Sequence, residues 1–126
     1  MATVLTQVGE EWIVDLIDGA VSASTDYIGW GTGTNTAAKG DTNLQTAASE
    51  ARSAATRTQP ITDRVRWVAT ITATGSKSIS EAGLFDAAGS GSPPSGGTPM
   101  MIRGDFTPVS VVSGDSIQFT IELEIT

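Results

Sequence analysis

The residues best suited to chemistry lie in one glycine-rich stretch at 27–44, YIGWGTGTNTAAKGDTNL. Its three glycines at alternate positions, its hydroxyls and Lys39 suggest a loop that binds phosphate. A Walker loop, however, requires G-x-x-x-x-G-K-[ST], and a dinucleotide fingerprint requires G-x-G-x-x-G, each between a strand and a helix. This stretch has G-x-G-x-G, and Asp41 would repel phosphate. We therefore predict a structural role, in which glycine permits positive φ and close approach of the backbone.

The rest of the chemical inventory is poor for catalysis. The chain has no cysteine and no histidine, which excludes thiolate chemistry and removes the commonest general base near neutral pH. Glu122 and Glu124 alternate along a strand-like segment, which favours a solvated face over an acid–base pair. The loop aspartates lie in separate segments and match no calcium-loop spacing. We expect a protein that is not an enzyme and has no cofactor and no metal.

Charge and hydropathy argue against nucleic acid and membrane as partners. The net charge is −7, and no cluster of Lys and Arg is present, which argues against direct binding of nucleic acid. No apolar run approaches the about 20 residues needed to cross a bilayer. The N-terminus has no basic region, and acidic residues interrupt its apolar stretch, so a secretory signal is not expected.

One helix is expected at the N-terminus, within residues 1–20. In residues 3–18, Val4, Val8 and Trp12 recur at the spacing of one helix face, opposite several acidic residues. Gly19 is well placed to end the helix. An interior glycine at position 9 costs about 1 kcal/mol relative to alanine.

Beyond the helix, apolar residues recur at every second position, as in a strand, and no longer with the helical period of 3.6 residues. Residues 116–126 (SIQFTIELEIT) alternate without a fault, which predicts a strand with one face in the core. Residues 107–112 are expected to pair with it as a hairpin across the Ser-Gly-Asp turn at 113–115. Further strands are expected at residues 26–30, 64–74, 76–87 and 100–106.

Two other segments are less regular. Residues 45–58 favour a helix by their alanines and an extended arm by their threonines. Residues 88–99 (AGSGSPPSGGTP) predict a long flexible loop. The whole chain, residues 1–126, reads as one domain in which a β-domain at 25–126 follows the helix. It is expected to be mainly β, a compact antiparallel β-sandwich or barrel with one N-terminal amphipathic helix.

The large side chains beside turns are the candidate contact residues. Trp12, Trp67 and Phe119 fall on apolar faces and fit a core. Trp30 flanks the glycine-rich turn, as Tyr27 does, and two methionines follow the 88–99 loop. Such residues serve either as the rim of the core or as anchors for a neighbouring subunit. An exposed Trp30 beside the Thr/Asn loop also suggests a carbohydrate-binding module.

Four pieces of the sequence occur in a fixed order: Tyr27–Gly33, Asp41–Leu44, Glu81–Ala87 and Gly114–Ser116 with the terminal strand. Together they resemble a group of small virion structural proteins of tailed bacteriophages. An arginine that follows Met100-Met101-Ile102 resembles one that recurs in that group. The similarity spans most of residues 25–126, and the 88–99 segment departs from it. The Glu-x-Gly-Leu-Phe-Asp element is also similar to one in tail-collar and fibre-base domains.

The resemblance implies structural work in a virion that is assembled in the host cytoplasm. It favours a capsid decoration or cement subunit that reinforces the head, with a neck, collar or tail-fibre adaptor as the alternative. The partners would be the major capsid protein, or neck and tail proteins, and further copies of the chain. The candidate interface residues are Trp12, Tyr27, Trp30, Met100, Met101 and Arg103.

Overall fold

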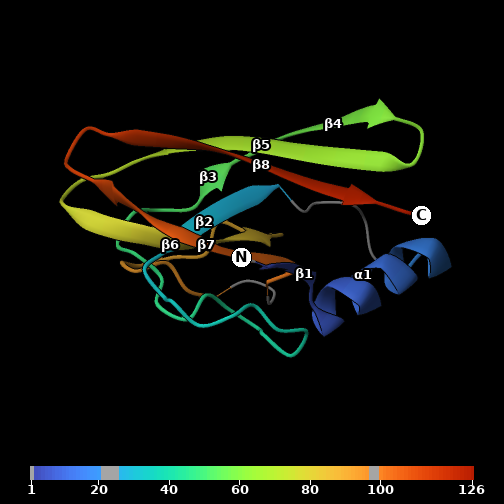
Figure 1. The fold of residues 1–126 in the computed structure, drawn as a ribbon. Coiled ribbons are helices and arrows are strands. Elements are labelled where there is room, and N and C mark those ends of the chain that lie inside the picture. The colour runs from blue at the N-terminus through green and yellow to red at the C-terminus, as the bar shows by residue number, and fades with distance from the viewer. Residues whose placement is uncertain (1, 21–25, 97–99) are drawn as a thin grey trace.

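The protein is a β-sandwich of two antiparallel sheets with one N-terminal helix (Figure 1). The computed structural model describes residues 2–20, 26–96 and 100–126. The sheets remain separate, so the sandwich alternative is confirmed and the closed barrel is wrong. No helix within these described ranges has the length and apolar character to cross a lipid bilayer.

The two sheets differ in size. In the larger sheet the strand order is β1-β7-β6-β2-β3, with bounds β1 Ala2–Leu5, β7 Ile102–Val111, β6 Lys77–Phe85, β2 Tyr27–Gly31 and β3 Ser53–Ala54. In the smaller sheet the order is β4-β5-β8, with bounds β4 Thr56–Ile61, β5 Arg64–Thr72 and β8 Ser116–Glu124. The helix α1 spans Gln7–Asp18.

The main core lies between the sheets. Trp30 of β2 and Trp67 of β5 are almost completely buried. The ring of Phe119, on β8, meets the Trp30 ring edge-on, with centroids 6.2 Å apart and planes at 89°, a favoured geometry for aromatic pairs. The prediction that Trp67 and Phe119 belong to the core is confirmed, although Phe119 is only half-buried.

The helix is shorter than its sequence pattern predicts. It begins after Thr6, whose Oγ1 accepts the Gly9 N–H at 3.0 Å as an N-cap. The same hydroxyl contacts the Met100 carbonyl at 2.8 Å. Residues 2–5 form β1 instead and pair with β7, because sheet pairing overrides a weak helical pattern in such a short segment. The predicted end is confirmed, since Gly19 is left-handed with φ 82°.

The predicted hairpin between residues 107–112 and the last strand is wrong. β7 pairs with β6 and β1, whereas β8 pairs along its whole length with β5. The turn at Gly114, where φ is 95°, therefore carries the chain from one sheet to the other. A turn signal is local, so it does not distinguish a hairpin from a corner between sheets.

Residues 45–58 take the extended alternative. Ala47 forms an isolated bridge with Gly31, and β3 and the start of β4 follow. In the 88–99 segment, Ser90 and Ser95 form a β-bridge that closes a turn, while residues 97–99 lie outside the described ranges. That the whole segment 88–99 is flexible stays a prediction.

Gly9 lets α1 pack directly on the strand connection. A Cβ at this position would lie 2.3 Å from the Met101 carbonyl oxygen and 2.8 Å from Leu5 Cδ1. The low helix propensity of glycine is thus offset by a contact that no larger residue allows.

We expect Gly9→Ala to destabilise the fold by about 1–3 kcal/mol through overpacking, although alanine favours a helix. Urea denaturation would measure the free energy of unfolding. Gly40→Ala is the control, because a Cβ there meets nothing within 4 Å, and a change within about 0.5 kcal/mol is expected. A more stable Gly9→Ala protein would contradict the close packing.

Candidate functional site

The most unusual site is a buried ion pair on the outer face of the larger sheet. A register shift in β6 lies between Ile79 and Glu81, and beyond it Leu84 joins the inter-sheet core. Glu81 faces the opposite side, and there residues 32–52 cover the sheet (Figure 1). Arg103 comes from the neighbouring strand β7, and neither side chain is exposed at all.

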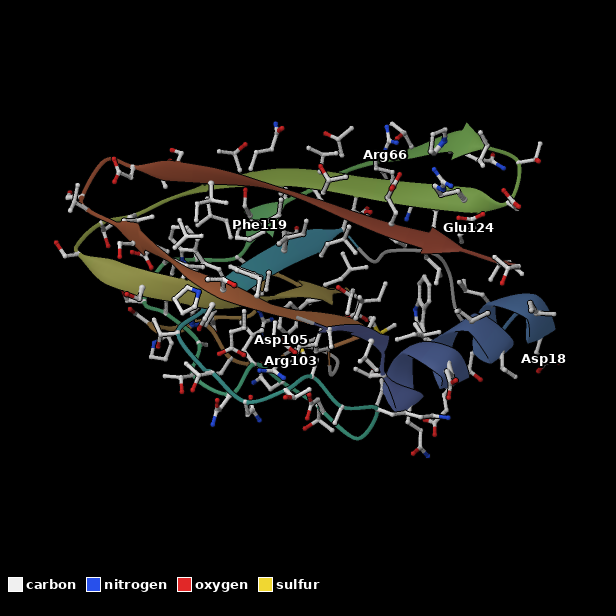
Figure 2. All side chains as sticks on the ribbon, in the orientation of Figure 1. Asp18, Arg66, Arg103, Asp105, Phe119 and Glu124 are labelled. Carbon is white, nitrogen blue, oxygen red and sulfur yellow. The ribbon has the colours of Figure 1, made fainter. Side chains whose placement is uncertain are left out.

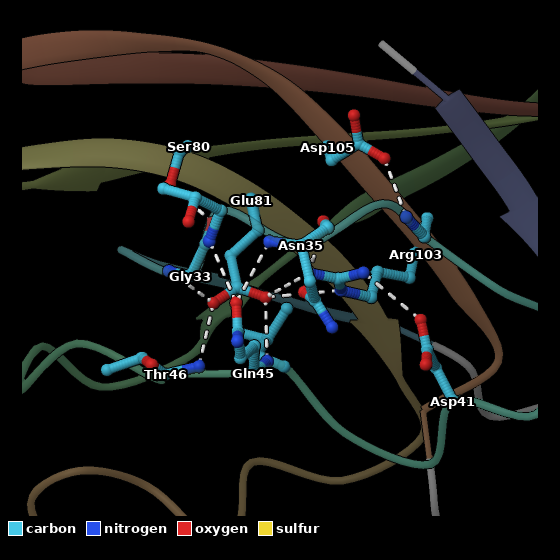
Figure 3. A network of polar contacts seen from close by, with 12 residues as sticks. Gly33, Asn35, Asp41, Gln45, Thr46, Ser80, Glu81, Arg103 and Asp105 are labelled. Carbon is cyan, nitrogen blue, oxygen red and sulfur yellow. Dashed lines mark hydrogen bonds and ion pairs between the residues drawn. The ribbon is translucent and has the colours of Figure 1, made fainter.

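The Glu81 carboxylate accepts five hydrogen bonds (Figure 3). Arg103 donates to Oε1 from Nε at 3.1 Å and from Nη2 at 2.9 Å. Backbone N–H groups supply the rest: Gln45 donates to Oε1 at 2.8 Å, and Gly33 and Thr46 donate to Oε2, each at 2.8 Å. Charge-assisted bonds of this kind offset the large cost of moving a carboxylate out of water.

Arg103 extends this network into the covering loop. Its Nη1 donates to Asp41 Oδ2 at 3.1 Å, and its Nη2 donates to Asn35 Oδ1 at 2.6 Å. Asp41 in turn accepts the Ala38 N–H at 2.8 Å. One guanidinium therefore holds the sheet and two points of the loop together, which its rigid fork of donors suits well.

The alternating glycines make room for the carboxylate. A Cβ on Gly31 would lie 2.4 Å from the Thr46 carbonyl oxygen, and a Cβ on Gly33 would lie 2.4 Å from Glu81 Oε2. The predicted close approach is confirmed, but positive φ is wrong here, since the positive-φ glycines found are elsewhere in the described chain. The glycine-rich loop does surround an anion, and that anion is the side chain of Glu81.

A second buried carboxylate, Glu50, fixes the far end of the same loop. Its Oε1 accepts the Trp30 indole N–H at 3.0 Å. Its Oε2 accepts the Thr74 N–H at 2.9 Å and also pairs with Lys77. Burial would raise the pKa of Glu50, but the bonds from Lys77, Thr74 and Trp30 together lower that pKa from 4.5 to about 2.

Arg52 closes the loop against the segment that follows β6. Its guanidinium lies 3.7 Å above the Phe85 ring and donates from Nη1 to the carbonyls of Ala87 and Gly96, each at 3.1 Å. Burial lowers the pKa of Arg52, and the charge of Asp86 opposes that shift. Residues 32–52 are thus tied down by charged contacts at three places.

Most of the predicted interface residues lie inside the subunit. Trp30 and Met101 are each 2% exposed, and Met100 and Arg103 are fully buried. The burial of these four side chains fits the core alternative. Trp12 and Tyr27 are half-buried against the core clusters. An interface role for the six residues stays a prediction.

The burial of Trp30 removes one of the two features that suggest a carbohydrate-binding module, the other being the polar Thr/Asn loop. Its indole packs between the sheets and donates to Glu50, so its ring offers no face to a sugar. Glu81 is equally inaccessible, with both oxygens occupied by the protein's own donors. Among the described residues, no group of three or more His, Cys, Asp or Glu could hold a metal ion. What this arrangement does is fix a loop to a sheet.

Sequence reasoning missed Glu81 and Glu50 as organising residues. A signal for Glu81 is present, because a lone carboxylate in the middle of the apolar strand SISEAGLF requires a buried partner. Glu50 has no such signal, since it lies in the irregular segment 45–52. Its partners come from distant parts of the chain.

We expect Arg103→Met to destabilise the protein by about 3–5 kcal/mol, because it leaves Glu81 buried without its counter-charge. Denaturation measures the loss, and amide hydrogen exchange should show faster exchange at Gly33 and Thr46. Lys39→Met is the control: its ion pair with Glu10 is exposed and should cost no more than about 1 kcal/mol. Equal losses in the two variants would count against a special role for the buried pair.

Glu50 should make stability depend on pH in the acid range. Because its folded-state pKa is lowered, its contribution is fully present above pH 4.5 and is lost as the pH falls toward about 2. The shift corresponds to on the order of 3 kcal/mol. Glu50→Gln should therefore be less stable than wild type at neutral pH, with a difference that narrows as the pH falls.

Urea titrations of both proteins between neutral and acid pH would test this expectation. Glu11→Gln, which removes an exposed carboxylate on α1, controls for the change in net charge. A difference between wild type and Glu50→Gln that stays constant across the acid range would refute the lowered pKa.

Compared with protein-family models, with curated proteins and with solved structures, the chain shows no match.

Proposed function

We propose that the chain is a non-enzymatic structural subunit of a tailed-bacteriophage virion, and that it decorates the capsid and reinforces the head. One observation carries the proposal. Three of the four motif pieces that resemble virion proteins contribute to a single contact network: Gly33 comes from the first piece, Asp41 from the second and Glu81 from the third, and Arg103 joins them. The resemblance therefore rests on residues that interact, rather than on scattered matches.

The physical properties of the network suit a subunit that works by shape. A decoration subunit transmits load between neighbours, so its own loops must hold their positions. Here the long connection 32–52 is fixed by ionic contacts that bury Glu81 and Glu50. A capsid also presents the same contact many times, so modest interfaces become strong through effective concentration.

A neck, collar or tail-fibre adaptor is the second candidate. It is favoured by the element Glu81–Ala87, which also resembles collar and fibre-base domains, and which lies at the centre of the network through Glu81. The two candidates share a rigid β-domain and differ in the number of copies per particle.

Quantified protein bands of purified virions would distinguish them. We expect hundreds of copies per particle for a head decoration subunit, against about a dozen for a neck or fibre role, because a capsid lattice repeats its sites many times. Particles that lack the subunit should also lose integrity sooner on heating or osmotic shock. Absence of the chain from purified virions would refute both candidates.

A further inference from the structure

The sandwich has strand edges of unequal character. Three of the four edges in the described chain are short or interrupted, as natural edge strands usually are to prevent pairing with other chains. β1 has 4 residues and β3 has 2. β4 contains Pro60 and a register irregularity between Thr58 and Ile61.

The fourth edge, β8, has none of these protections. It spans 9 residues without proline or glycine, and it pairs with β5 in unbroken register from Ser116 to Glu124. Along an antiparallel strand, the backbone N–H and C=O groups of successive residues point alternately toward one neighbouring strand and toward the other side. Because the Ile125 N–H bonds back to Asp63, the odd-numbered residues bond toward β5. The N–H and C=O groups of the even-numbered residues therefore point outward, and the described chain offers them no strand partner.

The charges on β8 do not protect this edge either. Arg66 Nε donates to Glu122 at 2.8 Å, and Arg64 Nη2 donates to Glu124 at 2.9 Å. Both carboxylates are thus matched by arginines of the neighbouring strand β5. An approaching strand meets a row of nearly neutral side chains.

An apolar groove runs beside the same edge. It has a volume of about 330 Å³, lies between β8 and the β1–β7 edge of the other sheet, and is lined by Ile102, Phe106, Phe119 and Ile121 among others. Phe119 lies between the two sheets (Figure 2) but remains half-buried. The core is therefore incompletely covered at the place where a further strand would add.

We propose that two copies of the chain associate through β8, which pairs with itself in antiparallel fashion about a twofold axis at Thr120. In this register all nine residues of each strand overlap. The outward-bonding residues meet one another, as the direction of the hydrogen bonds requires. The inner side chains of each copy, Phe119 and Ile121 above all, lie over the groove of the other.

The charges of β8 favour this register between two copies. Pairing about Thr120 places Glu122 opposite Gln118 and Glu124 opposite Ser116, so that no two carboxylates face each other directly. Pairing about Glu122 would oppose two glutamates and shorten the overlap, and like charges directly opposite are destabilising. The inference stands on the strand edges alone and does not depend on a virion role.

Light scattering coupled to size exclusion tests the dimer, and cysteine cross-linking tests its register. We expect a mass of twice 12.9 kDa. With oxidised glutathione as the oxidant we expect rapid disulfide formation by Thr120→Cys, since directly opposed Cα atoms about 5.5 Å apart suit a disulfide. The natural chain has no cysteine, so this thiol is unique. Thr58→Cys, exposed on the protected edge β4, is the matched control and should cross-link slowly.

A second variant separates pairing from folding. Thr120→Pro removes an outward N–H that β5 does not use, so we expect a monomer with an unchanged circular dichroism spectrum. The proposal is overturned by a wild-type monomer at every soluble concentration, by equal cross-linking at positions 58 and 120, or by a folded Thr120→Pro protein that still dimerises.

Discussion

The structure depends on one constraint: a carboxylate that reaches no water must have its charge matched inside the protein. Glu81 meets this constraint with donors from three places in the chain, two of Arg103's nitrogens and the backbone of residues 33, 45 and 46. Each donor restricts the sequence around it. A side chain on Gly33 would displace the carboxylate, and Arg103 needs Asp41 and Asn35 for its remaining donors. The path of the whole covering loop follows from these requirements.

A connection as long as residues 32–52 is unusual in a domain of this size, because long irregular loops normally leave the chain free to move. In this protein the loop packs few apolar side chains, chiefly Leu44 against Phe85 and Met100. Its position is set mainly by charge, through Glu81 at one end and Glu50 at the other. Removal of a single partner from a buried pair is far more costly than loss of a surface pair. The contacts that hold the loop in one position therefore also make it intolerant of substitution at the charged residues.

Periodicity predicted the parts of the fold in which one face meets the core and the other meets water. The alternation of β8 is of this kind, and so is the general sandwich class. The end of α1 at Gly19 was predicted from the preference of helix ends for glycine. Sheet order could not be predicted, since the turn at Gly114 has the same local form in a hairpin and in a corner. The network was missed for a similar reason. Glu81 and Thr46 are 35 residues apart, and no local pattern joins them.

The two sheets of the sandwich differ in how much of their surface the chain itself covers. The outer face of the larger sheet is closed by the chain itself, through the loop and its ion pairs. The smaller sheet ends at β8, in the other layer and away from that loop (Figure 1). If the open edge is satisfied by a second copy, the loop-covered face of each subunit stays accessible on the assembly. A larger partner would then meet a surface whose shape is fixed by buried charge.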